Sequence, residues 1–207
     1  MLKKHPSFPG YKGPVVTIVL DGFGFNPSTV GNAIAQARTP FWDKLMARYP
    51  HTLLKAHGTA VGMPSDEDMG NSEVGHNAIG AGRVYNQGAA LVSDAIANGS
   101  LFQKTAWREI SENARAKQST LHFIGLFSDG NVHSHIDHLK ALIIRAKEEG
   151  IRRVRVHVLL DGRDVPETSA LEYVEPFEQF LASLRGASFD ARIASGGGRM
   201  KVTMDRY

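Results

Sequence analysis

The chain has 207 residues, of which 42% are hydrophobic and 22% are charged, and these proportions exclude a disordered tail, a collagen and a coiled coil. It contains no cysteine, which excludes a disulfide framework and a thiolate zinc site. The net charge of +3 with neutral histidines is too small to indicate nucleic-acid binding.

The N-terminal segment does not have the pattern of a targeting signal. Lysines, prolines and glycines fill residues 1–14, where a signal peptide has an apolar stretch. The first apolar run, 15–20, ends at Asp21 and is far shorter than the ~20 residues of a membrane helix. We therefore expect a soluble, cytoplasmic protein that binds neither membrane nor nucleic acid.

The first third of the chain predicts one strand and one clear helix start. Residues 15–20 are apolar and mostly β-branched and lie between turn formers, so they predict a buried strand. Thr39 and Pro40 predict a helix, with the threonine as N-cap and the proline at the first helical position. A loop over 62–72 follows, and Ser72 is expected to open a further helix.

Helical and strand-like segments alternate over the rest of the chain. Residues 88–117 are predicted to be helical in two pieces, with the break near Asn98 and Gly99. The segments that follow are a strand over 121–127, a helix over 136–147, a strand over 154–160, a helix over 168–184 and a strand over 189–194. This order predicts an α/β fold with parallel strands joined by right-handed crossovers.

Each of these strands is followed by a polar segment that contains glycine. The three segments span 128–135, 161–164 and 195–199. Parallel sheets bind ligands beyond the carboxyl ends of their strands, and guanidinium groups suit carboxylate and phosphate. The pattern favours a site for an anionic small molecule, although plain turns, caps or structural ion pairs would account for each segment taken alone.

Two further residues have two possible interpretations each. Asp21 ends the first apolar run, where it is either part of a turn or a ligand for a hard metal ion such as Mg²⁺ or Mn²⁺. Ser72 at a helix start is either an N-cap or a nucleophile, and a hydroxyl needs a base or a metal to attack at neutral pH.

The motifs together resemble one family, the 2,3-bisphosphoglycerate-independent phosphoglycerate mutases of the alkaline phosphatase superfamily. The matching strings are Leu20-Asp21-Gly22-Phe23-Gly24, Met69-Gly70-Asn71-Ser72-Glu73-Val74-Gly75-His76-Asn77, Gly80-Ala81-Gly82-Arg83, Ser128-Asp129-Gly130-Asn131-Val132-His133-Ser134-His135, Asp161-Gly162-Arg163-Asp164, Gly198-Arg199 and Met204-Asp205-Arg206. They follow the family's order, and the string around Ser72 is the most specific of them.

The resemblance implies an organisation and an activity. Residues 1–86 would be the first segment of a split, metal-binding phosphatase domain, and 87–207 most of an inserted α/β transferase domain, each a three-layer domain with a parallel sheet. The family interconverts 3-phosphoglycerate and 2-phosphoglycerate in glycolysis and gluconeogenesis through a phosphoserine. It uses two divalent ions, Mn²⁺ or sometimes Mg²⁺, and no 2,3-bisphosphoglycerate, and its members are usually monomeric.

The resemblance also carries roles onto single residues. Ser72 matches the nucleophile, which also binds a metal, and Asp21 matches a carboxylate ligand of that same metal. The positions that match the substrate-binding side chains are His133, Arg163, Asp164, Arg199 and Arg206. Asp164 in addition matches a residue that handles the proton of the glycerate hydroxyl.

The family's chain is more than twice as long, and its remaining metal ligands have no counterpart here. We therefore expect this chain alone to be inactive and poorly stable. The alternative is a non-catalytic module that binds phosphoglycerate and keeps Ser72 as a relic. A different metal-dependent phosphatase of the superfamily is disfavoured, because the strings at 128–133 and 161–164 belong to the mutase insertion.

Overall fold

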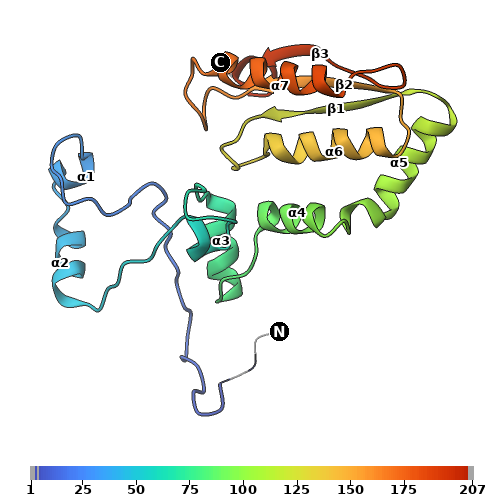
Figure 1. Cartoon of the computed structure of the whole chain (residues 1–207). Coiled ribbons are helices and arrows are strands. Elements are labelled where there is room, and N and C mark those ends of the chain that lie inside the picture. Colours follow the sequence, from blue (N-terminus) through green and yellow to red (C-terminus); the bar gives the residue numbers. More distant parts are fainter. Residues whose placement is uncertain (1–2, 4, 205–207) are drawn as a thin grey trace. The chain divides into compact units, whose positions relative to one another are not determined.

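The computed structural model describes residues 3 and 5–204 of the chain (Figure 1). The chain is divided between Leu54 and Lys55 into two compact units. No helix in the described part has both the length and the apolar character needed to cross a lipid bilayer.

The first unit contains two short helices, α1 (Ala33–Gln36) and α2 (Pro40–Arg48). The proline starts α2 as predicted, but Thr39 donates its hydroxyl to Asp43 Oδ1 at 3.1 Å and makes no capping bond to the backbone. None of the unit's described residues is buried. Over its described residues, the unit therefore has no apolar core of its own.

The strand predicted over residues 15–20 is not present in this structure. These residues have no strand assignment, and Ile18 keeps 77% of its surface exposed. A β-strand needs a neighbour that accepts and donates its backbone hydrogen bonds. The described part of the first unit offers none, so the β-branched run stays unpaired.

The second unit alternates helices and strands as predicted. Its elements are η1 (Gly58–Val61), α3 (Ser72–Ala81), α4 (Gly88–Ala97), η2 (Leu101–Gln103), α5 (Thr105–Ala116), β1 (Thr120–Phe127), α6 (Ile136–Glu148), β2 (Arg153–Leu160), α7 (Ala170–Leu184), β3 (Asp190–Gly198) and α8 (Arg199–Val202). The predicted helix start at Ser72 and the break near Asn98 and Gly99 are confirmed.

The three strands form one parallel sheet in the order β1-β2-β3, which confirms the predicted α/β class (Figure 1). The register aligns the strand ends, with Phe127 opposite Leu160 and Leu160 opposite Gly198. The pairing of β2 and β3 shifts between Val156 and His157, where Ala194 is the extra residue. The segment that follows each strand therefore begins at the same edge of the sheet.

The core lies on one face of this sheet. On β2 the valines at 154, 156 and 158 are buried, whereas Arg155 and His157 alternate toward the other face. Helices α5, α6 and α7 contribute the other half of the core, with Trp107, Ile143 and Phe177 among its members. Alternate burial of this kind fixes the register, because a slip by one residue exposes every core side chain.

We expect Phe177→Ala to destabilise the second unit by about 3–5 kcal/mol, measured by chemical denaturation. Phe177 is fully buried, and its ring meets that of Phe127 edge to face, with the centroids 4.9 Å apart. Leu171→Ala is the matched control on the same helix, since Leu171 is 66% exposed, and it should change the free energy of unfolding by less than about 0.5 kcal/mol. Equal losses for both variants would contradict this core.

Candidate active site

A buried ion cluster occupies the shared edge of the sheet. Arg199, which follows β3, is only 6% exposed and places Nη1 2.7 Å from Asp161 Oδ1 and 2.6 Å from Asp164 Oδ2. Both carboxylates come from the segment after β2. The arginine therefore joins two strand ends by charge-assisted hydrogen bonds.

Asp161 organises the segment after β2. Its side chain is fully buried, and Oδ1 accepts the backbone N–H of Arg163 at 3.1 Å and of Asp164 at 3.0 Å. Gly162 supplies the positive φ of 63° that this turn requires. Burial opposes ionisation, but the nearby Ser128 side chain and the hydrogen bonds from the two amides and Arg199 hold the pKa of the Asp161 carboxyl below its usual range.

Arg199 is held in its charged form by the same contacts. Burial by itself would lower its pKa, yet the hydrogen bonds and charges of Asp164 and Asp161 raise the pKa of the guanidinium above its ordinary value. Nη1 is committed to these two carboxylates, so any contact of Arg199 with a ligand has to use the other guanidinium nitrogens.

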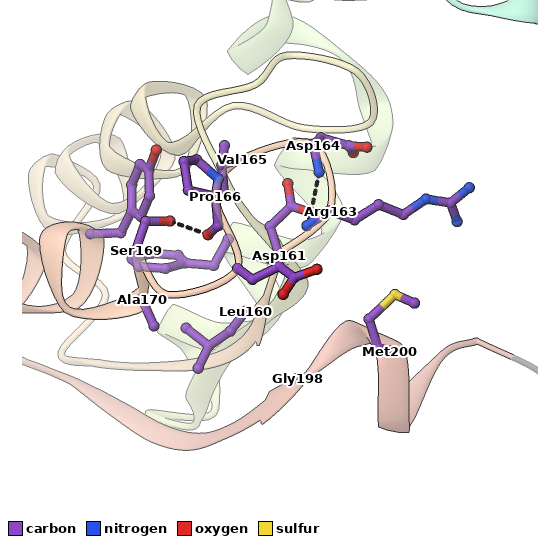
Figure 2. A pocket seen from close by; sticks show the side chains of 14 residues that line it. Leu160, Asp161, Arg163, Asp164, Val165, Pro166, Ser169, Ala170, Gly198 and Met200 are labelled. Carbon is purple, nitrogen blue, oxygen red and sulfur yellow. Dashed lines mark hydrogen bonds between the residues drawn. The ribbon is translucent and has the colours of Figure 1, made fainter. Parts of the chain in front are cut away.

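Arg163 and His133 are the exposed basic side chains of the site. The Arg163 side chain points away from Asp161 in Figure 2, and within the described part of the chain it makes no ion pair. Its Nη1 lies 3.7 Å from the sulfur of Met204. His133 Nε2 lies 4.0 Å from Asp164 Oδ2, and 58% of the His133 side chain is exposed. These two side chains are available to an anion from solvent.

A hollow of about 870 Å³ lies beside the cluster and is lined by Asp161, Arg163 and Asp164 together with residues of α7 (Figure 2). On its wall the Tyr173 hydroxyl donates to Asp129 Oδ1 at 2.8 Å. Burial and the Asp129 carboxylate raise the pKa of Tyr173 to about 12, so this tyrosine keeps its proton at neutral pH.

Ser72 is the first residue of α3, but it is not the cap of this helix. Asn71 is the N-cap, and its side chain accepts the Val74 N–H at 3.0 Å. The capping interpretation of Ser72 is therefore wrong. The Ser72 hydroxyl lies 3.2 Å from His76 Nδ1, and the same nitrogen lies 2.7 Å from the Ser72 carbonyl.

These distances indicate which ring nitrogen of His76 carries a proton. A carbonyl accepts only, so Nδ1–H donates to it and cannot at the same time accept the Ser72 proton. His76 in this position is therefore not a base for Ser72. The hydroxyl remains exposed at the start of the helix.

The sequence prediction that Asp21 is a metal ligand remains untested. Asp21 is exposed in a turn in which the Phe23 N–H donates to the Leu20 carbonyl at 3.3 Å, and Gly22 adopts a φ of 72°. It belongs to the first unit and Ser72 to the second, so their joint role stays a prediction. Arg206 lies outside the described residues.

A complete metal site is not present in the described chain. Carboxylate and hydroxyl oxygens such as those of Asp21 and Ser72 suit a hard divalent cation, which needs about six ligands. Over residues 3 and 5–204, no three His, Asp or Glu side chains gather closely enough to hold an ion. The described residues therefore do not complete the expected dinuclear centre.

The fold and the site define a class: an α/β domain whose parallel strands present arginine, aspartate and histidine side chains at one edge. The family model described as "BPG-independent PGAM N-terminus (iPGM_N)" matches residues 92–207. The chain therefore belongs to this family.

Three relatives illustrate the match. A probable 2,3-bisphosphoglycerate-independent phosphoglycerate mutase of Leptospira interrogans is 58% identical over 195 residues, which cover 93% of this chain and 36% of that protein. The Arabidopsis thaliana phosphoglycerate mutase 1 of the same type is 50% identical, with 100% and 37% covered. A crystal structure of Leishmania mexicana phosphoglycerate mutase at low cobalt concentration is 51% identical, with a TM-score of 0.77 over 84% of this chain and 32% of that one.

The chain thus spans little more than a third of the curated relatives that it matches.

We expect Asp161→Ala to lower the free energy of unfolding of the second unit by about 3–5 kcal/mol in urea titrations, because it removes one of the two carboxylates that pair the buried Arg199 and leaves two amides without their acceptor. Asp137→Ala is the control. The Asp137 side chain is 66% exposed and 3.0 Å from Lys140, and its loss should cost less than about 1 kcal/mol. Similar losses from both substitutions would argue against a special role for Asp161.

The lowered pKa of Asp161 also predicts an acid dependence. A carboxyl whose pKa falls on folding stabilises the protein above its unfolded pKa of about 3.9, and this contribution is lost as the pH falls through the lower, folded value. The unfolding free energy should therefore drop below about pH 4. Asp161→Asn should be less stable at neutral pH and should show a shallower drop, measured by urea titration between pH 7 and pH 3.

Proposed function

We propose that this chain is the N-terminal part of a 2,3-bisphosphoglycerate-independent phosphoglycerate mutase. The whole protein would interconvert 3-phosphoglycerate and 2-phosphoglycerate in glycolysis and gluconeogenesis. The observation that carries the proposal is the gathering of Arg163, Asp164, Arg199 and His133 where parallel strands end. This edge offers cations for phosphate and carboxylate beside a carboxylate that can take a hydroxyl proton.

The residues of the second unit divide these tasks. Arg163 is exposed and free of carboxylates in the described chain, so it binds the charged groups of the phosphoglycerate with His133 beside it. Arg199 holds Asp164 through Oδ2, and Oδ1 accepts no hydrogen bond from the described residues. That free oxygen is the atom to which the glycerate hydroxyl passes its proton. Such positioning accounts for much of the catalysis of phosphoryl transfer.

Ser72 is the proposed nucleophile and carrier of the phosphoserine. Its position in the first turn of α3 supports this role, because backbone N–H groups and the helix dipole there favour a phosphate. Two divalent ions, Mn²⁺ or Mg²⁺, would supply charge stabilisation in the whole protein, with Asp21 and Ser72 as ligands of one of them. No 2,3-bisphosphoglycerate is required.

The proposed organisation places residues 1–86 in a split phosphatase domain and 87–207 in an inserted transferase domain. The lack of buried residues among the described positions of the first 54 supports the view that this part depends on chain from elsewhere in the protein. We propose that the whole protein acts as a cytoplasmic monomer, with phosphoglycerate as its small-molecule partner.

We expect the 207-residue chain to form no 2-phosphoglycerate from 3-phosphoglycerate and Mn²⁺, and Ser72→Ala to behave identically. Turnover that depends on Ser72 would overturn the view that the site is incomplete. The assay requires a sample that circular dichroism has shown to be folded.

The chain should nevertheless bind 3-phosphoglycerate, measured by calorimetry. Arg163→Ala should weaken binding by at least about tenfold, because a charge-assisted hydrogen bond is lost. Arg153→Ala is the matched control, since Arg153 is exposed at the start of β2 and Arg163 lies beyond the other end of that strand. Binding that survives Arg163→Ala would contradict the proposed site, and binding without turnover in a completed protein would favour the non-catalytic module.

A further inference from the structure

Two loops that are far apart in the sequence meet outside the ion cluster. The loop over 62–72 leads into Ser72, and the loop over 128–135 carries His133. Asn131 Nδ2 donates to Asp68 Oδ1 at 2.7 Å across a separation of 63 residues. Asn71 Nδ2 makes a second, longer contact of 3.5 Å with the Val132 carbonyl. Each loop therefore touches the other through side chains next to a motif residue.

Asp68 is oriented by its own loop before it meets Asn131. Its Oδ2 accepts the backbone N–H of Ser65 at 2.8 Å and the Ser65 hydroxyl at 2.9 Å, and its carbonyl accepts the Gly58 N–H at 3.0 Å. Burial opposes ionisation, but the hydrogen bonds from Asn131 and Ser65 hold the pKa of the Asp68 carboxyl below its usual range. Asn131 thus donates to a carboxylate, which makes a stronger bond than a neutral acceptor.

Asn131 is also held in place within its own loop. It is 8% exposed and adopts a φ of 54°, a left-handed conformation that asparagine tolerates better than most residues. Its neighbour Gly130 lies so close to Asp164 that an added Cβ would come within 3.3 Å of the Asp164 Cβ. The loop therefore lies between Asp68 and the carboxylate proposed to handle the substrate proton. A bond between two groups that are already fixed costs little additional entropy.

We propose that the Asp68–Asn131 hydrogen bond is a clasp that positions the turn bearing Ser72 against the loop bearing His133. Asp68 and Asn131 are positioning residues in this scheme and do not touch substrate. The functional meaning of the clasp rests on the proposed roles of Ser72 and His133, whereas the existence of the clasp does not.

The test is a charge swap in the 207-residue chain. Asn131→Asp sets two carboxylates against each other and keeps a side chain that tolerates positive φ. Adding Asp68→Asn restores the contact, because the new amide keeps its oxygen toward Ser65 and turns its N–H₂ toward the carboxylate introduced in the opposite loop. The reporters are the hydrogen-exchange rates of the Val74 and Gly75 amides on α3, both bonded to Asn71, and of the Ile136 amide, bonded to Ser128.

We expect Asn131→Asp to speed exchange in both segments by roughly tenfold to a hundredfold and the swap to bring it back near the parent rate. Asp66→Asn added to Asn131→Asp is the matched control. It removes the same charge from the same loop, but the described hydrogen bonds of the Asp66 side chain go to Thr59 and not to the 128–135 loop. It should therefore not restore the exchange rates. The Asn131→Asp defect should also fade below about pH 4, where protonating one carboxyl restores a donor.

The clasp is overturned if Asn131→Asp speeds exchange in the 128–136 segment alone, or if Asp66→Asn rescues as well as Asp68→Asn. Unfolding of the Asn131→Asp variant that the swap does not reverse also counts against the clasp.

Titration with 3-phosphoglycerate separates the two proposals. Affinity that falls in Asn131→Asp and returns in the swap supports positioning of the site, and affinity that stays unchanged refutes it. A parent chain that binds no 3-phosphoglycerate counts against the proposed function, and exchange at Val74 and Gly75 still decides whether the clasp holds the Ser72 turn.

Discussion

The site depends on one buried guanidinium, that of Arg199, between the carboxylates of Asp161 and Asp164. A charge removed from water is tolerated only when it is paired and its hydrogen bonds are satisfied. This requirement ties the end of β3 to the end of β2, and Ser128, just after β1, helps to keep the Asp161 carboxyl ionised. The same contacts that make the burial possible also fix the carboxylate proposed to act on the substrate.

The two units differ in how their apolar residues are used. In the second unit, alternating strand residues and three helices bury one face of the sheet around Phe177 and Ile143. In the first unit, residues 15–20 have the composition of a buried strand, but the described part of the unit provides no strand beside them and their side chains are exposed. Apolar composition therefore produces a core only where the backbone hydrogen bonds also find partners.

The arrangement of the motifs separates rigid from adjustable parts of the site. Arg199, Asp161 and Asp164 are held by the sheet edge, whereas Ser72 lies on a helix whose start contacts the opposite loop through Asn71 and through the nearby Asp68. The start of this helix is also held by apolar packing, since Val74 is buried against Val61 and Met63. Paired charges therefore fix the cluster at the sheet edge, whereas the contact between the two loops rests on hydrogen bonds to a carboxylate and to a backbone carbonyl.

Much of the fold was predictable from the sequence, because local periodicity specifies local structure. The apolar spacing over 136–147 and 168–184, the apolar run at 121–127, the strand-like run at 154–160 and the helix start at Ser72 all correspond to elements of the structure. The motif strings pointed to the family for the same reason, since each is a short run of adjacent residues. Parallel pairing of neighbouring strands followed from their order along the chain.

Tertiary structure alone decided what depends on residues far apart. The burial of Asp161, the partnership of Asp68 with Asn131 and the unpaired state of residues 15–20 each depend on groups distant in the chain, or on a neighbour that the described first unit does not provide. The choice of Asn71 over Ser72 as the helix cap was also hidden, because both residue types cap helices well and only the backbone geometry chooses between them. Sequence patterns thus determined the elements and the kind of chemistry, and three-dimensional contacts determined which side chains are buried, paired or free to act.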